Sequence, residues 1–449
     1  MIPKRPINAD VPAAKKEEKQ EPEKAPSSEA KAPKKAPAPR QPKPLAPKLL
    51  AGLVVLALVF IVVAIVGSSG GKDDPGGAVS PAPASVSRDD GDETPSPQVA
   101  EALAFPSFAT SNTTRIGGPD PSSNAAGVAL AVFPSTTPSQ RPAAVTVVDE
   151  DDPIGAIAAA VLMAPPVRAP ILFTREGELP EDSAEALAAL APTGSKDTGG
   201  VSVFAVGGGS PELTAVGKVQ RLLGARPTQF GKASTIAGAR EELAGPPKHI
   251  VIAPVTEPEF AAPAAAWAAR SGDPVLFVEP DRLPPETAGV LKAHPKVPVY
   301  VLGPESVIAK DVVKEIEKVS KRVKRVAGDD PVANALALAR YGDGGFGWNV
   351  NDPGHGFVLA RSDSPAGAAA AAPLSASGTW GPLLLTDSAA TLPQALRDYF
   401  LDVKPGYTND PTRAFYNRVW VIGDQEAIDV VQQAEVNELA ELAQIGGGE

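Results

Sequence analysis

The chain has 449 residues, more than one domain usually holds, and it contains no cysteine. This absence excludes disulfides, thiolate catalysis and cysteine-ligated zinc, and the three histidines stand far apart without metal-ligand spacing. The net charge of −11 is uneven: residues 1–48 hold 12 Lys or Arg against 6 Asp or Glu, whereas the sequence after residue 71 has a net charge of −17. So acidic a body argues against nucleic-acid binding, which depends on neutralising phosphates.

Residues 1–48 are rich in Pro, Ala, Lys and Glu and predict a disordered basic tail. Leu49–Val66 is an uncharged run of 18 residues, of which fourteen are Leu, Val, Ile or Phe. It predicts a transmembrane helix over 49–67, because a buried soluble helix is rarely so pure after Pro-rich polar sequence.

The flanking charges orient this helix. Lysines and arginines precede it, and Lys72, Asp73 and Asp74 follow it, which predicts a cytoplasmic N-terminus and an extracellular C-terminal portion. A cleaved signal peptide would need a 48-residue n-region, so we expect an uncleaved single-pass anchor in the plasma membrane. Residues 68–111 are rich in Pro, Gly and Ser and predict a linker.

The remainder repeats one unit three times, over 112–224, 225–322 and 323–445. Each copy has three short apolar runs, typical of parallel strands buried on both faces. The first runs are Ala143–Val148, His249–Ala253 and Phe357–Ala360. The middle runs are Pro170–Thr174, Pro274–Val278 and Pro382–Thr386, and the last are Val201–Val206, Val299–Leu302 and Arg418–Ile422.

Proline and alanine mark the same places in each copy. Every middle run is followed by Leu-Pro, which predicts the start of the next helix. Ala-rich helices are expected between the first and middle runs, over Pro153–Met163, Ala261–Ala269 and Pro365–Ser375, and a further helix over Ile308–Val326. Strands alternating with helices predict an α/β fold of three tandem units with short parallel sheets.

An Arg-x-x-Gly-x-Asp element opens the copies. It is found within Thr114–Asp120 and again within Lys324–Asp330, whereas the second copy retains only Phe230–Lys232. A Pro-Ile-Leu-Leu-Thr type strand and a closing Val-Gly-Gly element accompany it, at Ala169–Thr174, Gly381–Thr386 and Val206–Gly208.

In these motifs the chain resembles the type 2 cell wall-binding repeat family, over residues 112–430. The resemblance implies Toprim-like α/β units packed as three around a pseudo-threefold axis. It also implies binding of a wall polymer, with Arg115, Asp120, Arg325 and Asp329 as candidate ligand-binding residues. The family's Asp-Ala-Leu element is replaced here by Gly155–Ile157 and Gly367–Ala369, so its acidic residue is missing.

The acids after the first strand are a candidate metal site. Asp149, Asp151 and Asp152 lie where the carboxyl end of a parallel strand gathers ligands, and oxygen ligands suit a divalent cation. The alternative is a solvated loop with Asp152 at a helix N-terminus.

Aromatic residues in two insertions of the third copy are candidate sugar contacts. The insertions, Tyr341–Gly356 and Leu401–Asn417, interleave aromatics with amides and acids, and Trp348, Trp380 and Tyr407 are the expected stacking residues. Lys318 belongs to a cluster of basic residues on the predicted helix Ile308–Val326, which could bind an anionic polymer. Ordinary packing of long loops and helix ion pairs are the alternatives.

No P-loop, dinucleotide fingerprint or nucleophile elbow is present, so we expect no enzyme activity, no cofactor and no nucleotide. The sequence favours a membrane-anchored surface protein that binds a cell wall polysaccharide or anionic wall polymer non-covalently. One alternative is an envelope scaffold for protein contacts whose repeats have lost glycan binding. Another is a metal-dependent envelope enzyme.

Overall fold

The computed structural model describes residues 108–445 except 208–211, 224–227 and 378–380, all within one compact unit, Asp90–Glu449. The predicted cytoplasmic tail, the predicted membrane helix, nearly all of the predicted linker and Trp380 lie outside the described residues. Among the described helices, none has the length and apolar character needed to cross a membrane.

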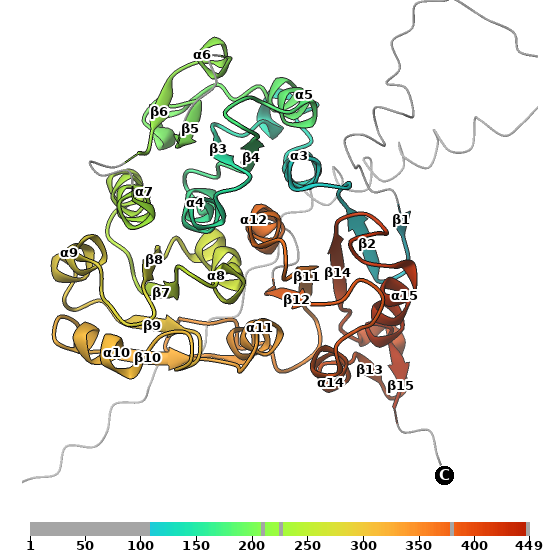
Figure 1. Cartoon of the computed structure of the whole chain (residues 1–449). Helices are drawn as coiled ribbons and strands as arrows, with labels where there is room; N and C mark the ends of the chain where they lie inside the picture. Colours follow the sequence, from blue (N-terminus) through green and yellow to red (C-terminus); the bar gives the residue numbers. More distant parts are fainter. Residues whose placement is uncertain (1–107, 208–211, 224–227, 378–380, 446–449) are drawn as a thin grey trace, which may run out of the picture. The chain divides into compact units, whose positions relative to one another are not determined.

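Three sheets with parallel pairing and one common strand order form the framework (Figure 1). The first contains β4 (Ile171–Thr174), β3 (Val145–Asp149), β5 (Val203–Val206) and β6 (Val219–Arg221). The second contains β8 (Val275–Val278), β7 (Ile250–Pro254), β9 (Val299–Leu302) and β10 (Val323–Val326). The third contains β12 (Leu383–Thr386), β11 (Gly356–Arg361), β14 (Arg418–Ile422) and β2 (Thr113–Ile116), with β1 (Phe108–Ala109) antiparallel at its edge. The predicted α/β class with several short parallel sheets is confirmed.

The fourth strand of each sheet, β6, β10 or β2, comes from outside the three strands predicted for that copy. Strand β10, which opens the third copy as bounded from the sequence, pairs with β9 of the second sheet. Strand β2, near the start of the described chain, pairs with β14 near its end, so that Thr114 lies opposite Trp420. The two ends of the repeat region are therefore joined within one sheet.

Three Ala-rich helices, one from each copy, pack pairwise against one another: α4 (Pro153–Ala159), α8 (Pro258–Ser271) and α12 (Pro365–Ala370). They lie between the three sheets (Figure 1). Their alanines are all buried, and a methyl side chain lets helices approach closely without overpacking. The predicted Ala-rich helices thus form a shared interior for the three copies.

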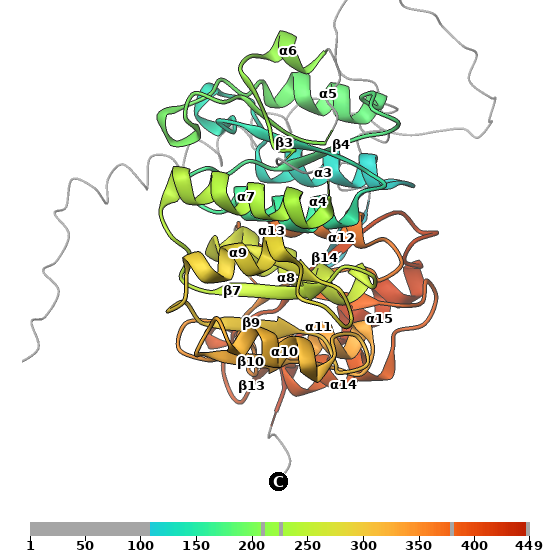
Figure 2. The ribbon, with the colours of Figure 1, turned by 60° about the vertical axis from the view of Figure 1, so that its left-hand side comes forward.

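The remaining helices cover the sheets. They are α3 (Pro121–Val132), α5 (Glu181–Leu190), α7 (Gln229–Ala244), α9 (Pro285–Ala293), α10 (Lys310–Glu317), α11 (Pro331–Arg340), α14 (Gln394–Asp402) and α15 (Val430–Leu439), with short α6 (Leu213–Val216) and α13 (Ala372–Ser375). In Figure 2, α7, α9 and α10 lie on the near side of the molecule. As the Leu-Pro pairs predicted, α5, α9 and α14 each begin directly after a proline.

The predicted helix over Ile308–Val326 is wrong in its second half. Helix α10 ends at Glu317, and Val323–Val326 is strand β10. The valines recur every three or four residues, which satisfies a helix pattern, but β9 presents a row of backbone groups that need partners. Ser320, buried between the two elements, donates a hydrogen bond to the Val297 carbonyl.

Candidate functional site

Arg115, the first predicted ligand residue, is buried inside the protein. Its Nε and Nη2 donate to the Gln433 side chain at 3.1 and 2.8 Å. The remaining bonds go to the backbone carbonyls of Gly423, Asp424 and Ile428, at 2.7, 2.5 and 2.6 Å. All five N–H donors are therefore used to hold β2 against the segment after β14, and burial lowers the pKa of the guanidinium.

Arg325 occupies the same position in the second sheet. It donates to the carbonyls of Gly303 and Ile308 at 2.6 and 2.8 Å and is only half-buried. Arg221 has the corresponding register on β6, opposite Ala205, and is exposed. Arg221 lies just before the second copy as bounded from the sequence, so an arginine of the opening element is present there as well as Phe230–Lys232, which corrects the sequence interpretation.

The aspartate that matches Asp120 in the third copy is Asp330 rather than Asp329. Each of these two lies five residues after its arginine and caps a helix: Asp120 accepts from the Ser123 N–H at 2.9 Å and Asp330 from the Ala333 N–H at 2.7 Å. The exposed Asp329 precedes the cap. A shared Asp-Pro-x-x-Asn pattern in the two copies was the sequence signal for this register.

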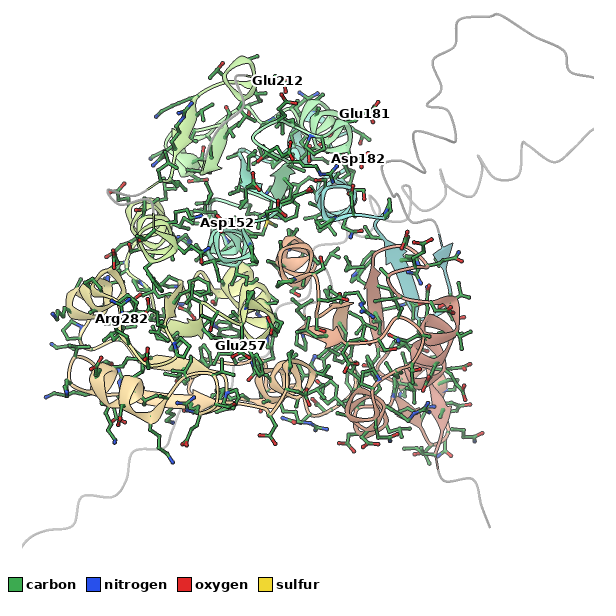
Figure 3. All side chains as sticks on the ribbon, in the orientation of Figure 1. Asp152, Glu181, Asp182, Glu212, Glu257 and Arg282 are labelled. Carbon is green, nitrogen blue, oxygen red and sulfur yellow. The ribbon has the colours of Figure 1, made fainter. Side chains whose placement is uncertain are left out.

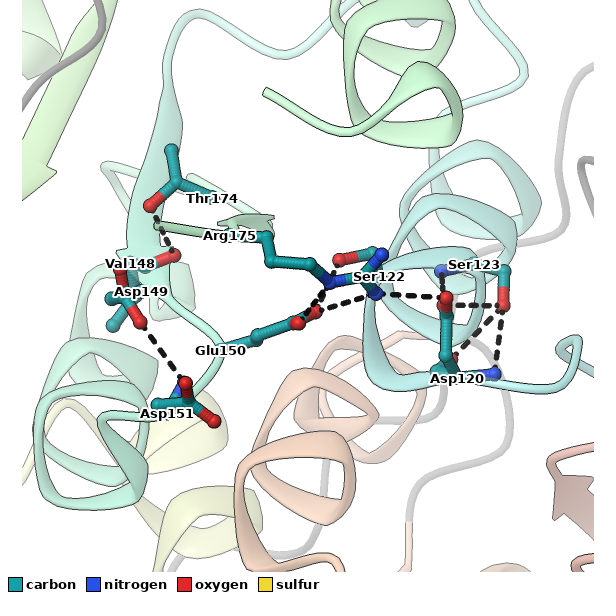
Figure 4. A network of polar contacts seen from close by, with 9 residues as sticks. All are labelled: Asp120, Ser122, Ser123, Val148, Asp149, Glu150, Asp151, Thr174 and Arg175. Atoms are coloured by element: carbon teal, nitrogen blue, oxygen red, sulfur yellow. Dashed lines mark hydrogen bonds and ion pairs between the residues drawn. The ribbon is translucent and has the colours of Figure 1, made fainter. Parts of the chain in front are cut away.

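Asp120 also belongs to an ion cluster that joins the first and third sheets (Figure 4). The Arg175 Nη2 donates to Asp120 at 2.9 Å, and its Nε pairs with Glu150, which also accepts from Ser122. Although partial burial alone would raise the pKa of Asp120, bonds from Ser123 and Arg175 lower it. Asp120 is therefore a capping and bridging residue.

The three acids predicted to bind a metal are not brought together. Asp149 accepts from the Asp151 backbone N–H at 3.1 Å. Asp152 caps α4 by accepting from the Gly155 N–H at 2.9 Å and pairs with Lys232 (Figure 3 places Asp152 at the start of α4). Within the described ranges, no group of three or more acidic or histidine side chains is arranged to hold a metal ion.

The predicted sugar contacts lie apart from one another. Lys318 is exposed at the end of α10, and Tyr407 is half-buried in the short strand β13 (Gly406–Tyr407), which pairs with β15 (Ala443–Gln444). Trp348 is buried, with its ring edge-on to Trp267 at a centroid separation of 5.6 Å and the Arg270 guanidinium 5.2 Å from its centroid. Trp348 is thus packed in a wall rather than exposed as a platform.

A cavity of about 640 Å³ lies beside this wall, and we call it the loop cavity. It opens at the amino ends of β7 and β8. The predicted metal site at Asp149–Asp152, in contrast, lies at the carboxyl end of β3. Its lining residues are Lys248, His249, Trp267, Arg270, Ser271, Asp273, Gly342, Asp343, Gly344, Gly345, Phe346, Gly347 and Asn349. From the sequence, His249 was predicted only as the first residue of a buried strand, and Tyr341–Gly356, which supplies Gly342–Gly347 and Asn349, was predicted as an insertion of the third copy with sugar contacts.

One wall of the loop cavity is organised around Asp273. This carboxylate is buried and accepts from the backbone N–H of His249 at 2.9 Å and from the Trp267 indole N–H at 3.0 Å. Its other contact is with the His249 Nδ1, at 3.0 Å. The only hydroxyl in the lining, that of Ser271, donates to the Trp267 carbonyl instead of pairing with His249. No nucleophile and base are therefore paired among the residues that line this cavity.

The opposite wall is a glycine-rich loop between α11 and β11, residues Gly342–Gly347. Gly344 and Gly345 form its tip with φ of 57° and 104°, and Asp343 and Phe346 exchange backbone hydrogen bonds at 2.8 and 2.9 Å. Gly347, at φ 90°, is required by space as well, because a Cβ there would lie 2.2 Å from the Tyr341 carbonyl oxygen.

Two side chains fix this loop to the second sheet. Phe346 stacks on Tyr300 with a centroid separation of 3.6 Å. Asp343 accepts from the Lys324 Nζ at 2.7 Å and from the Tyr300 hydroxyl at 2.9 Å, and these bonds lower the pKa of Asp343. Burial, together with the bond to Asp343, raises the pKa of Tyr300. The loop from the third copy is thus held in place over the second.

The solved structures with a similar fold include two from Clostridium difficile, Cwp6 and Cwp8. Cwp6 aligns with 74% of this chain at 16% identity and a TM-score of 0.57, and Cwp8 with 74% at 20% identity and a TM-score of 0.56. The alignments cover 48% and 52% of those chains, so this chain spans about half of their length. At such identities the likeness concerns the fold alone. No protein-family model matches the chain, and no curated protein matches it.

Proposed function

We propose that this chain is a cell-envelope protein whose three joined repeats bind a wall glycopolymer non-covalently. In this proposal Leu49–Val66 anchors it in the plasma membrane, the basic tail is cytoplasmic and the repeats lie outside the cell. The observation that carries the proposal is the fold shared with the cell wall proteins Cwp6 and Cwp8. The Toprim-like character and pseudo-threefold packing implied by the family resemblance belong to the same proposal.

The chemistry of the repeats supports binding rather than catalysis. The loop cavity has cationic and amide side chains in its lining, and its hydroxyl is not paired with its histidine. Of the acids considered as metal ligands, Asp149 accepts from the Asp151 backbone N–H and Asp152 pairs with Lys232, and the described residues contain no group of three or more side chains that could hold a metal ion.

A scaffold for protein contacts is a second candidate function. It is favoured by exposed apolar side chains on the third copy: Phe415 is 69% exposed, Tyr416 50% and Ile445 59%. Such residues are enriched at protein interfaces when they gather on one surface. This candidate needs no glycan at all, which makes the two functions separable by experiment.

The test is sedimentation with purified wall sacculi. The full-length chain, in a non-ionic detergent, would be mixed with native sacculi and with sacculi stripped of secondary polymers by acid. We expect the chain to pellet with native walls only. Equal pelleting with both would point to the peptidoglycan itself, and failure to pellet with either would reject wall binding and leave the scaffold function.

A further inference from the structure

We infer that the loop cavity binds one negatively charged sugar unit, a sugar that carries a phosphate or a carboxylate. This inference rests on the proposed function and specifies which class of unit in the polymer is recognised and where. The cavity volume of about 640 Å³ falls in the range of ~300–1,000 Å³ typical of ligand sites.

The charge at the cavity favours an anion. Lys248 and Arg270 both line it, and the exposed Lys248 forms no ion pair within the described part of the chain. The two carboxylates in the lining are already compensated: Asp273 by the donors around it, and Asp343 by Lys324 and Tyr300. The charge of Lys248 is therefore left to attract a ligand, although the sequence after residue 71 as a whole is acidic.

The exposed polar groups of the lining suit a sugar. Trp267 and Phe346, whose ring centroids lie 5.0 Å apart, are both buried, so they pack the wall and leave little ring surface to a ligand. Asn349 offers an amide that both donates and accepts, and Arg270, whose guanidinium lies 5.2 Å from the centroid of the Trp348 ring, adds a second positive charge beside Lys248. A cavity with a few convergent polar groups is a common form of ligand site.

The walls are positioned before any ligand arrives. The glycine-rich loop is fixed by the Phe346–Tyr300 stack and by the bonds to Asp343, and the facing wall by the bonds to Asp273. Glycines at the loop tip bring backbone close to the cavity without side chains that would fill it. Little ordering is needed on binding, which lowers the entropic cost of holding a small ligand.

The site occurs once among the three copies. Its loop is an insertion between α11 and β11, whereas the connection between α7 and β7 in the second copy is much shorter. The corresponding segment of the first copy, between α3 and β3, contains no glycine. We therefore expect one anionic sugar per chain rather than three.

The experiment is isothermal titration of the full-length chain with glucose 1-phosphate, glucuronic acid and, as the neutral control, glucose. The two anionic arms separate phosphate from carboxylate as the recognised group. Lys248→Glu reverses the uncompensated charge at an exposed position, and Lys292→Glu makes the same change on α9 of the same copy, away from the cavity.

We expect at least one anionic sugar to bind at one per chain, and glucose to bind at least about tenfold more weakly. Lys248→Glu should weaken anion binding at least about tenfold and Lys292→Glu should leave it unchanged. Binding should also weaken on raising salt from about 50 to about 300 mM, because screening acts on an exposed charge. Equal affinity for glucose, three sites per chain, or an unchanged Lys248→Glu variant would overturn the inference.

Sedimentation with native sacculi is run in parallel, so that a failure of wall binding can be distinguished from a failure of sugar binding in the loop cavity. Wild-type chain that pellets with walls but binds neither anionic sugar would overturn the loop cavity as the site and leave wall binding intact. Chain that binds an anionic sugar but does not pellet would reject wall binding and retain the site.

Discussion

Replacing Arg115 with alanine should destabilise the repeat region strongly. The substitution removes five hydrogen bonds, which all come from one buried guanidinium. It leaves three backbone carbonyls and the Gln433 amide oxygen without these donors in a buried place. Because β2 and β14 are far apart in sequence, these bonds also help to join the two ends of the repeat region.

The magnitude follows from the cost of unpaired buried groups. Removing one partner from a buried charged network lowers the free energy of unfolding by about 3–5 kcal/mol, because the remaining groups stay buried without a partner. Arg325→Ala is the matched comparison, because it removes two hydrogen bonds from a half-buried guanidinium at the same position of the second sheet. We expect about 1–2 kcal/mol there.

The measurement is urea unfolding of the full-length chain, followed by tryptophan emission, since Trp420 lies directly opposite Thr114 in the affected sheet. Hydrogen exchange would locate the loss of protection, which we expect in β2 and β14 first. A cost below about 1 kcal/mol for Arg115→Ala, or one no greater than that of Arg325→Ala, would refute the reasoning. It would show that the buried carbonyls find other partners at little cost.

Three further predictions concern the loop and the helix caps. Gly347→Ala should cost at least about 2 kcal/mol or displace the loop, because φ is positive and the new Cβ would meet the Tyr341 carbonyl; an unchanged Tm and crystal structure would contradict this. Asp330→Ala should lower stability by about 1 kcal/mol through loss of a helix cap, whereas Asp329→Ala should not, and equal Tm shifts would reject the assignment. The pKa of Asp343 is lowered below its ordinary 3.8 in the folded protein, so its contribution should be complete above about pH 4 and lost as pH falls through the lower, folded value. Hydrogen exchange of the loop against pH checks this sign, and protection that rises on acidification would contradict it.

The strands could be predicted because their pattern is local. Runs of consecutive apolar residues indicate strands covered on both faces, and prolines fix where the middle strands and the following helices begin. The segment Val323–Val326 shows the limit of this reasoning: its valine spacing also fits a helix, and only the free edge of β9 decides for a strand.

The roles of the opening arginines could not be read from their motif. Arg115 and Arg325 occupy equivalent positions, yet one is enclosed and the other half-exposed, because burial depends on which segments pack over them. The sequence interpretation likewise named Asp329 instead of Asp330 in the third copy, although the Asp-Pro-x-x-Asn pattern shared with the first copy indicates Asp330, and the helix caps show that Asp330 is the equivalent of Asp120.

By itself, the sequence determined the repeat, the strand type, the Ala-rich helices and the glycine-rich insertion, all of which depend on residues close together in the chain. Only the tertiary structure decided that the chain's first described parallel strand, β2, completes its last sheet, and that the insertion of the third copy covers His249 and Asp273 of the second. The physical reason is that the chain satisfies exposed strand edges and buried polar groups with whichever segment lies nearest in space, however distant it is in sequence.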